Sequence, residues 1–504
     1  MKSNEIVLDE KRCNGCGVCV RTCPQFVYES AGNGAPVAVA HGSRCIGCMA
    51  CEEDCARGAL KVHRLPDGMS LGDVPEPCKG LDADAVHDVL IIGAGPAGLG
   101  AAIRARTLGL SVAVIERLPS PCRAHHPDGG QFSTSPDVYK VDKRPGGLFI
   151  GGLDLIVPQR FVLEWLRDFI FMGPDGFATK SAKGEAFIPI VAKDGLVETL
   201  ADRSRELGAV IAYNTRAGRI EKRGADGLVG VECDDGMRLR AKVVISAEGI
   251  TGRLSAAVGI PVNEMGVGWA YAVETVQPPV AEALDEMVFL LGRVAGAPDM
   301  PFFSFWSSGS HHVKLVTGPL QTEKSRQLQA PLTDCLDGYA TKDERVAKRV
   351  GRFTSPFDNY DGCRVYGRRL PCTGVGDGVL AVGDAVATAG MCGTPTAIKT
   401  GDVAAQVAAS AIGRGDTSAA GLADFDKLVM RNSMMTEMKM MHNILIEATL
   451  NLSQADLRDF YKLLRHLELT RLMSGVYVMP LVKFLIKALP GLIRRPDLRA
   501  YMKS

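Results

Sequence analysis

The residues most able to do chemistry are cysteines, and eight of the 15 in this 504-residue chain lie within its first 55 positions. They form two runs in which three cysteines follow one another at intervals of three positions and a fourth comes four positions later. Three thiolates at this spacing wrap around one iron–sulfur cubane, and the fourth cysteine reaches the neighbouring cluster. The runs therefore predict two 4Fe-4S clusters, one held by Cys13, Cys16, Cys19 and Cys55 and the other by Cys45, Cys48, Cys51 and Cys23.

Other chemistry fits these cysteines less well. Zinc needs four ligands, usually in two pairs, and leaves the regular spacing unexplained. A disulfide scaffold does not concentrate an odd total of cysteines at one end of a long chain. Gly15, Gly17 and Gly47 suit a backbone folded tightly around clusters. Residues 1 to about 65 resemble bacterial dicluster ferredoxins, apart from Ala56, where that family usually has proline.

A glycine-rich turn provides a second chemical site. The apolar run 89–92, expected as a buried strand, leads into a G-x-G-x-x-G turn, and small residues over 100–107 predict a helix. A second strand over 111–115 ends at an acid that can accept both hydroxyls of an adenosine ribose. Pyrophosphate would bind at the helix N-terminus. Strand, turn, helix, strand and acid in this order predict a dinucleotide site made by Gly93, Gly95, Ala97, Gly98 and Glu116.

Three later segments resemble para-hydroxybenzoate hydroxylase-like flavoproteins, and they favour FAD over NAD. An apolar strand delivers Asp384 at a glycine turn, Gly383, which is similar to the motif that binds the FAD ribityl chain. Another apolar strand, which ends in Glu248 and Gly249, is similar to an alanine-aspartate-glycine element with glutamate in place of aspartate. Lys193, just before an expected helix, stands where these proteins have an arginine that contacts FAD.

The resemblance is to the superfamily that contains geranylgeranyl reductases and electron-transfer-flavoprotein:quinone oxidoreductases. The run that contains Gly393, Thr394 and Lys399 is similar to a segment beside the isoalloxazine in the quinone oxidoreductases. Cys122 resembles instead a cysteine of the geranylgeranyl reductases and is the candidate catalytic residue, with His125 or a water as alternative proton donors. The quinone oxidoreductases usually carry one cluster at the C-terminus, and the reductases' aromatic substrate motif is not recognisable in this sequence.

Adjacent histidines and a group of aromatic residues have simpler interpretations. Neighbouring residues on a strand point to opposite faces, so at most one histidine of each pair can face a flavin, and surface or core placement is expected. The pairs are His125–His126 and His311–His312. The aromatic residues of the strand-like region 288–316 are expected to pack within a sheet, with the wall of a lipid pocket as the alternative. They are Phe302, Phe303, Phe305 and Trp306.

The chain after residue 430 is expected to be helical. Its methionines favour adaptable core packing, with a pocket for a flexible apolar substrate as the alternative. The apolar stretch 472–492 is interrupted by lysines and prolines, so it lacks the run of about 18 residues that spans a bilayer. The basic end suits either an anionic membrane surface or an ordinary docking helix. It also resembles the helical C-terminal region of archaeal-type geranylgeranyl reductases.

Composition limits the remaining function classes and the domain organisation. The 58 basic and 57 acidic residues leave a formal net charge of +1, which gives no field to attract nucleic acid. The first residues lack the pattern of a secretory signal, so we expect a cytoplasmic protein with peripheral contact to the inner membrane face as an additional expectation. The expected fold is α/β and α+β. Its segments are a dicluster ferredoxin domain (1–65), a linker (66–86), a Rossmann-like FAD-binding domain with an inserted antiparallel substrate sheet (87–430) and a helical C-terminal region (431–504).

The fusion of clusters with a flavin site indicates an FAD- and iron–sulfur-dependent oxidoreductase. Clusters exchange single electrons, whereas a flavin can accept them singly and release a hydride. The leading hypothesis is that a low-potential donor, a ferredoxin or an electron-transfer flavoprotein, supplies electrons for the reduction of a carbon–carbon double bond in an isoprenoid lipid. One alternative is an electron relay to a membrane quinone. Another is a non-enzymatic electron-carrier subunit of a larger redox complex.

Overall fold

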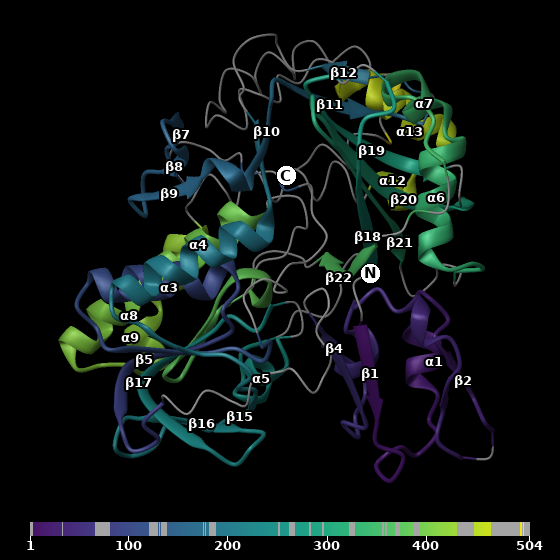
Figure 1. Cartoon of the computed structure of the whole chain (residues 1–504). Coiled ribbons are helices and arrows are strands. Elements are labelled where there is room, and N and C mark those ends of the chain that lie inside the picture. Colours follow the sequence, from purple (N-terminus) through teal and green to yellow (C-terminus); the bar gives the residue numbers. More distant parts are fainter. Residues whose placement is uncertain are drawn as a thin grey trace.

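The chain folds into a small cysteine-rich part and two larger parts, each built on a β-sheet (Figure 1). The expected fold class, α/β and α+β with an N-terminal ferredoxin-type part, is confirmed. This computed structural model describes residues 4–32, 34–65, 81–119, 130, 132, 139–174, 176, 178–180, 188–249, 252–261, 268–281, 284–294, 297–321, 328–354, 357, 360–367, 373–386, 393–430, 448–464, 494, 495 and 497.

The cysteine-rich part has internal repetition. Its first and last strands are antiparallel and pair from Asn4–Arg64 to Leu8–Leu60. Its apolar core is small and is completed by cysteine side chains, so its stability depends on what those cysteines bind. The elements are β1 (Asn4–Leu8), α1 (Val18–Thr22), β2 (Tyr28–Glu29), β3 (Ala38–Val39), η1 (Gly42–Arg44), α2 (Ala50–Glu53) and β4 (Leu60–Arg64).

The second part is built on an eight-stranded sheet with the order β14-β6-β5-β17-β16-β15, to which β24 and β23 are added beside β17. Its central strands are parallel, and every described residue of β6 is buried, as expected for a Rossmann-like sheet. The strands are β5 (Val86–Ile92), β6 (Val112–Ile115), β14 (Val210–Ala212), β15 (Ala217–Ile220), β16 (Val229–Cys233), β17 (Arg238–Ser246), β23 (Val375–Gly376) and β24 (Val379–Ala381).

Helices cover one face of this sheet (Figure 1). Two of them, α3 and α8, approach so closely that an added Cβ on Gly100 would lie 2.7 Å from the Ile398 carbonyl oxygen, and one on Gly401 would overlap the Ala97 carbonyl. Small residues therefore determine this helix pair. The helices are α3 (Pro96–Thr107), α4 (Lys193–Glu206), α5 (Arg253–Ala257), α8 (Gly393–Arg414), α9 (Ala419–Leu422) and α10 (Asp424–Met430), with the 3₁₀ turn η6 (Gly383–Ala385).

The third part is a seven-stranded sheet with the order β12-β11-β19-β20-β21-β18-β22, antiparallel except for the β11–β19 pair. Helices α6 (Leu332–Lys342) and α7 (Glu344–Val350) pack against it. Phe302 and Trp306 lie in its core, and the Trp306 ring is 6.2 Å from that of Tyr339 on α6. The strands are β11 (Asp168–Met172), β12 (Ala178–Lys180), β18 (Gly268–Gln277), β19 (Glu286–Val294), β20 (Ala297–Ser308), β21 (Val313–Gln321) and β22 (Asp361–Gly367).

Short elements connect the two larger parts. They are β7 (Val141–Arg144), β8 (Gly147–Ile150), β9 (Leu155–Pro158), η4 (Gln159–Phe161), β10 (Val162–Leu166) and β13 (Ile188–Val191). Near the C-terminus, α12 (Ala448–Asn451) and α13 (Gln454–Leu464) are helical, and Leu457 lies 3.8 Å from an ideal Cβ on Gly292 of β19. Within the described ranges, no helix is both long and apolar enough to cross a membrane.

Candidate functional site

Two cavities inside the cysteine-rich part are lined by the eight clustered cysteines. We call the cavity lined by Cys13, Cys16, Cys19 and Cys55 the outer cavity, and the cavity lined by Cys23, Cys45, Cys48 and Cys51 the inner cavity. They hold about 330 and 300 Å³ of space free of protein atoms, part of which is open to solvent. These are the two groups that the spacing predicts, and each gathers one cysteine from the other run.

The repeated loops around the cavities use the same backbone conformation. Gly15 and Gly47 occupy equivalent positions and both have a φ of 66°. An added Cβ on Gly15 would overlap the Ala35 carbonyl, so glycine is required there. Gly17 precedes α1 with a φ of 69°, and Met49 precedes α2 with a φ of 64°. The second repeat therefore places a buried methionine in a left-handed conformation, which costs about 1 kcal/mol.

The chemistry of the inner cavity fits a metal cluster. Burial raises the pKa of the Cys45 thiol to about 11, and it also raises the pKa values of Cys48 and Cys51. Such thiols ligate as thiolates only when a bound cation offsets the cost of burying their charge. No three His, Cys, Asp or Glu side chains of the described residues converge on a single metal-ion position. The four cysteines that line this one cavity suit a multi-iron cluster.

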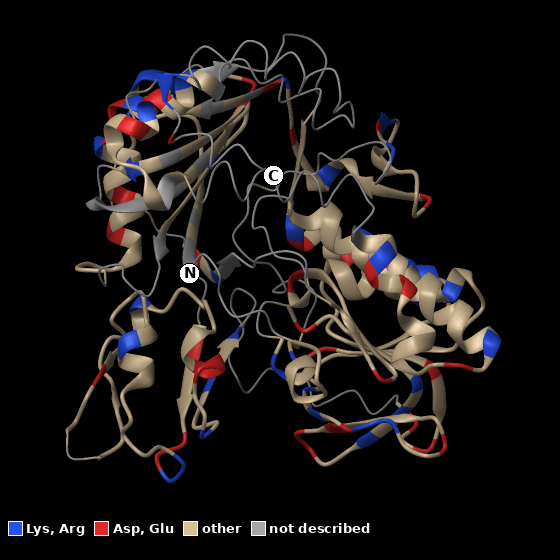
Figure 2. Cartoon of the chain, turned by 180° about the vertical axis from the view of Figure 1, so that it is seen from behind, with Lys and Arg blue, Asp and Glu red and all other residues tan. Residues whose placement is uncertain are grey.

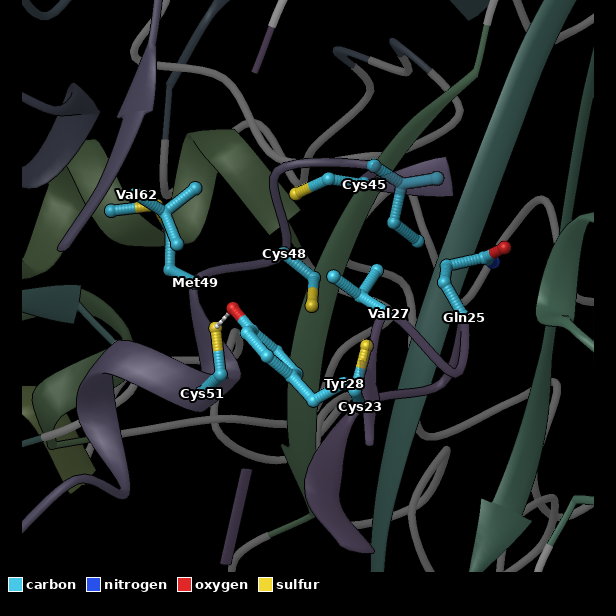
Figure 3. A pocket seen from close by; sticks show the side chains of 10 residues that line it. Cys23, Gln25, Val27, Tyr28, Cys45, Cys48, Met49, Cys51 and Val62 are labelled. Atoms are coloured by element: carbon cyan, nitrogen blue, oxygen red, sulfur yellow. Dashed lines mark hydrogen bonds between the residues drawn. The ribbon is translucent and has the colours of Figure 1, made fainter. Parts of the chain in front are cut away.

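A tyrosine lies against one of the inner cysteines. The buried Tyr28 hydroxyl donates to the Cys51 sulfur over 3.0 Å, and the thiols of Cys23 and Cys48 face the same space (Figure 3). Hydrogen bonds to ligand sulfurs tune cluster potentials. Sequence analysis did not identify Tyr28, because an aromatic residue of a small core carries no signal for contact with a ligand.

The glycine-rich turn has a backbone geometry that would suit a phosphate. Gly95 is the extended residue before α3, with Pro96 at the first helical position. An added Cβ on Gly98 would overlap the Gly93 carbonyl, whereas one on Gly95 would meet no described atom within 4 Å. The close approach at Gly98 explains why the turn closes onto the helix. The open space at Gly95 leaves room for a phosphate at the helix N-terminus. This geometry fits a dinucleotide, with Ala97 in the first turn of α3.

Glu116 lies at the end of β6, beside this turn. Its carboxylate accepts hydrogen bonds from the Ala94 amide at 2.7 Å and from the Leu118 amide at 2.9 Å, one at each oxygen. Each carboxylate oxygen has a further lone pair, so Glu116 can accept ribose hydroxyls in addition. The contact with Ala94 also ties the acid to the glycine-rich turn.

The second flavin motif meets the first in space. Gly383 of η6 has a φ of 63°, and its ideal Cβ would lie 2.8 Å from the Cβ of Ala97 on α3. Its amide donates to the Thr400 hydroxyl at 2.8 Å, which joins η6 to α8. The neighbouring Asp384 is exposed. Residues almost 300 positions apart, 97 and 383, are thus brought to one place by the parallel sheet.

The other predicted flavin contacts have defined places. Glu248 accepts four hydrogen bonds, from the Ser246 hydroxyl, the Leu254 amide, and both the amide and hydroxyl of Ser255, at 2.8–2.9 Å. It therefore caps α5, and any contact with FAD uses its remaining lone pairs. Gly249 has a φ of 73° and no described atom within 4 Å of an ideal Cβ. Lys193 is the first residue of α4.

The N-terminus of α8 contains Gly393, Thr394 and Lys399. Gly393 is exposed with open space beside it, and Thr394 is buried. Lys399 Nζ lies 3.3 Å from a carboxylate oxygen of the buried Asp402 and 5.1 Å from the centre of the Tyr139 ring. Arg104 of α3 also pairs with Asp402. Lys399 thus joins an ion-pair network between α3 and α8, a role that sequence analysis did not assign to it.

Three consecutive acids at the end of α2, Glu52, Glu53 and Asp54, attach the cysteine-rich part to the larger parts. We call them the acidic clamp. They pair with three arginines from three different places: Arg216 before β15, Arg117 after β6 and Arg364 on β22. The three acids are consecutive and lie between two cluster cysteines. Sequence analysis did not use this pattern as a signal.

The ion pairs of the acidic clamp differ in length. Arg364 donates two hydrogen bonds to the Asp54 carboxylate, at 2.8 and 2.5 Å, and its side chain is 6% exposed. Glu53 lies 3.9 Å from Arg117, the residue directly after the ribose-binding candidate Glu116. The clamp therefore contacts the adenosine end of the dinucleotide site and the seven-stranded sheet at once.

Apolar contacts and backbone hydrogen bonds also attach the cysteine-rich part to the seven-stranded sheet and its helices. Ile46 and Ala50, which flank an inner-cavity cysteine, belong to the hydrophobic core of the seven-stranded sheet. The Gly362 amide of β22 donates to the Ile46 carbonyl at 2.9 Å, and a Cβ on Gly362 would overlap the Ile46 side chain. The Leu332 amide of α6 donates to the Pro24 carbonyl at 2.9 Å. The inner cavity is therefore built against the seven-stranded sheet.

The remaining predicted residues are Cys122 and the two pairs of adjacent histidines. Cys122, His125 and His126 lie outside the described residues. His311 is exposed and His312 is buried, but both lie in the turn between β20 and β21 and not on a strand, so the expected alternation between two faces of a sheet does not apply to them. Burial lowers the pKa of His312, whose Nδ1 lies 3.6 Å from Glu164 on β10.

Comparison with known proteins agrees with both groups of motifs. The family described as FAD dependent oxidoreductase matches residues 88–366, and the 4Fe-4S dicluster domain matches residues 5–56. Digeranylgeranylglycerophospholipid reductase 1 of Methanothermobacter thermautotrophicus is 25% identical over 420 residues, which are 80% of this chain and 96% of that protein. Protein FixC of Salmonella typhi is 27% identical over 383 residues, 68% of this chain and 81% of FixC.

A solved structure supports the fold. A geranylgeranyl bacteriochlorophyll reductase-like protein from Thermoplasma acidophilum has a TM-score of 0.64 at 19% identity, and the alignment covers 82% of this chain and 99% of that protein. The family match extends over more than half of the chain, from the first strand of the dinucleotide site to β22. The chain therefore belongs to the FAD dependent oxidoreductase family, as an enzyme whose cofactors are FAD and two 4Fe-4S clusters.

Proposed function

We propose that this protein is a reductase in which electrons pass through the two 4Fe-4S clusters to FAD and then, as hydride, to a carbon–carbon double bond of a membrane-associated isoprenoid lipid. The observation that carries the proposal is the attachment of the cysteine-rich part to both sheets by the acidic clamp. Clusters supply single electrons and FAD supplies hydride, so this fixed combination suits a reduction that needs two electrons.

The residues that would hold these cofactors follow from the geometry. The outer and inner cavities would each hold one cluster through four thiolates. The turn of Gly93, Gly95 and Gly98 would bind pyrophosphate at the N-terminus of α3, and Glu116 would accept ribose hydroxyls. Gly383 and Asp384 would face the ribityl side, beside the N-terminus of α8.

The lipid substrate is supported by the relatives. Several proteins named digeranylgeranylglycerophospholipid reductase match this chain at 25–28% identity, over 66–81% of its length. We propose that the seven-stranded sheet, whose core is apolar, serves as the substrate domain. We therefore assign this chain an apolar polyprenyl substrate and a low-potential donor, a ferredoxin or an electron-transfer flavoprotein.

Reduction of an alkene by hydride leaves the second carbon in need of a proton. We propose Cys122 as its donor, with His125 or a water as alternatives. The Cys122→Ala variant should keep its bound flavin, measured by absorbance, and should lose turnover with the lipid. Unchanged turnover would remove Cys122 from the reaction.

Peripheral contact with the inner membrane face remains part of the proposal. The basic C-terminal segment would supply it, but one of its arginines is already engaged. Arg495 donates to Asp459 at 2.9 Å and to Asp456 at 2.7 Å, both on α13. Arg495 therefore pairs with α13.

The similarity to FixC favours a second candidate, an electron relay from an electron-transfer flavoprotein to a membrane quinone. An anaerobic experiment separates the two. The purified protein, reduced stoichiometrically in detergent, is mixed with a geranylgeranyl lipid or with a short-chain quinone, and flavin reoxidation is followed by absorbance. Reoxidation by the lipid with a saturated product supports the reductase. Fast reoxidation by the quinone alone would establish the relay.

A further inference from the structure

We propose that the exposed side of the outer cavity is the docking surface for an acidic electron-carrier protein that delivers single electrons there. The inference rests on the proposed function in one respect, that reducing electrons reach FAD through the clusters. It adds the site of electron uptake and the kind of protein that supplies the electrons.

The first observation is a difference in exposure. Cys16 of the outer cavity is the one exposed residue among the eight cluster cysteines, all of which are described. Cys51 of the inner cavity is buried, and Cys48 packs against the core of the seven-stranded sheet. A carrier protein can therefore approach the outer cluster more closely than the inner one.

The second observation is a group of cations around the outer cavity, which we call the basic rim. Arg21 Nη1 donates to the Cys16 carbonyl at 3.3 Å, and Arg57 lines the cavity itself. Arg12 Nη1 donates to the Gly58 carbonyl at 3.4 Å. The basic rim consists of the exposed residues Lys11, Arg12, Arg21 and Arg57.

The third observation is how charge is distributed over the cysteine-rich part. The acidic clamp faces the larger parts, and its three carboxylates pair with arginines there. Two acids, Asp9 and Glu10, lie next to the basic rim in the sequence, whereas the rim itself contains four cations. The basic rim thus carries an excess of positive charge beside the exposed Cys16, whereas the clamp acids are already paired. Figure 2 shows charged side chains of both signs on the cysteine-rich part.

These observations select an acidic partner. A positive surface around a redox centre attracts a negatively charged carrier and orients it before contact, and salt weakens the attraction. The step itself transfers one electron. The carrier is oxidised by one electron, the outer cluster is reduced by one, and no covalent bond forms or breaks.

The test uses the holoprotein and a purified acidic ferredoxin. The Arg21→Glu/Arg57→Glu double variant reverses two charges of the rim. Arg44→Glu/Lys61→Glu makes the same change in net charge at two exposed cations of the same part outside the rim. Calorimetric titration at low and at 0.2 M salt measures the affinity, and stopped-flow absorbance measures the rate of reduction by the ferredoxin and by dithionite.

We expect the rim variant to lose at least about tenfold in affinity and in the rate with ferredoxin at low salt. The control should change less than about twofold, and the rate with dithionite, a small anion, should fall by a smaller factor in the rim variant than the rate with ferredoxin. Lys11→Glu/Arg12→Glu, which leaves α1 untouched, repeats the test if the first variant folds poorly. Equal losses in rim and control variants, or no loss in either, would overturn the proposal. Because no lipid is present, failure of lipid reduction would leave this result unaffected.

Discussion

The outer and inner cavities are made by the same cysteine spacing, yet their surroundings are opposite. The outer cavity has an exposed cysteine and a rim of exposed cations. The inner cavity has no exposed cysteine, a tyrosine hydrogen-bonded to one of its sulfurs, and neighbours that belong to the core of another sheet. The motif therefore determines which metal group is held, whereas the residues between and around the cysteines determine which partner each cluster faces.

Removing one ligand from each cavity gives the largest expected contrast. Cys51→Ala and Cys16→Ala should each lose a cluster, measured by iron content. Loss of the inner cluster should also loosen the contacts of Ile46 and Ala50 and lower the free energy of unfolding by on the order of 3 kcal/mol more than loss of the outer one. Equal destabilisation, measured by urea unfolding, would show that the inner cavity is not built into the sheet.

Breaking the clamp should give the next largest effect. Arg364→Ala removes the two hydrogen bonds that Arg364 donates to Asp54 and leaves the one from the Thr22 hydroxyl. We expect a loss of about 2 kcal/mol because Asp54 is only partly buried. Arg44→Ala, at an exposed cation, should change stability by less than about 0.5 kcal/mol. Hydrogen exchange of residues 46–54 provides the local readout. Equal exchange in both variants would contradict the clamp.

Removing the Tyr28 hydroxyl is a smaller change to the inner cavity than removing a cysteine. In Tyr28→Phe, the Cys51 sulfur loses a hydrogen bond that stabilises the more negative, reduced cluster. The midpoint potential of one cluster should fall, and the fold should lose about 1 kcal/mol. The potential of the other cluster, measured in the same titration by electron paramagnetic resonance, is the internal control. Two unchanged potentials would exclude this role for Tyr28.

The smallest expected effect is a pH dependence on the inner side. Burial lowers the pKa of His63 on β4 below its ordinary 6.5, although Glu52 opposes the shift. The unfolded chain therefore binds more protons below pH 6.5, so stability is complete above that pH and falls as the pH falls through 6.5 toward the folded pKa. His63 is half-buried, and solvent screens its charge, so the loss should stay below about 0.5 kcal/mol. Urea midpoints at pH 7.5 and 5.5 should differ less in His63→Gln, and an unaltered difference would exclude His63 as the cause.

The local parts of this account could be read from the sequence, because short-range chemistry determines them. The strand before Gly93, the acid at the end of β6 and the grouping of cysteines by spacing all depend on residues close in the chain. The clamp could not be predicted, because it joins residues 52–54 to arginines 117, 216 and 364 through tertiary packing. Glu248 shows an intermediate case. Its resemblance suggested a flavin contact, whereas the structure also uses it to cap a helix five residues on.

The central claim is that electrons enter at the outer cavity and leave from the inner one, and one measurement tests it most directly. Cys16→Ala holoprotein that retains FAD and the inner cluster is mixed with a reduced acidic ferredoxin, and flavin reduction is followed by stopped-flow absorbance. The account predicts a fall in rate of at least about tenfold relative to the unchanged protein. A rate equal to that of the unchanged protein would contradict it, because the ferredoxin would then reach FAD without the outer cluster.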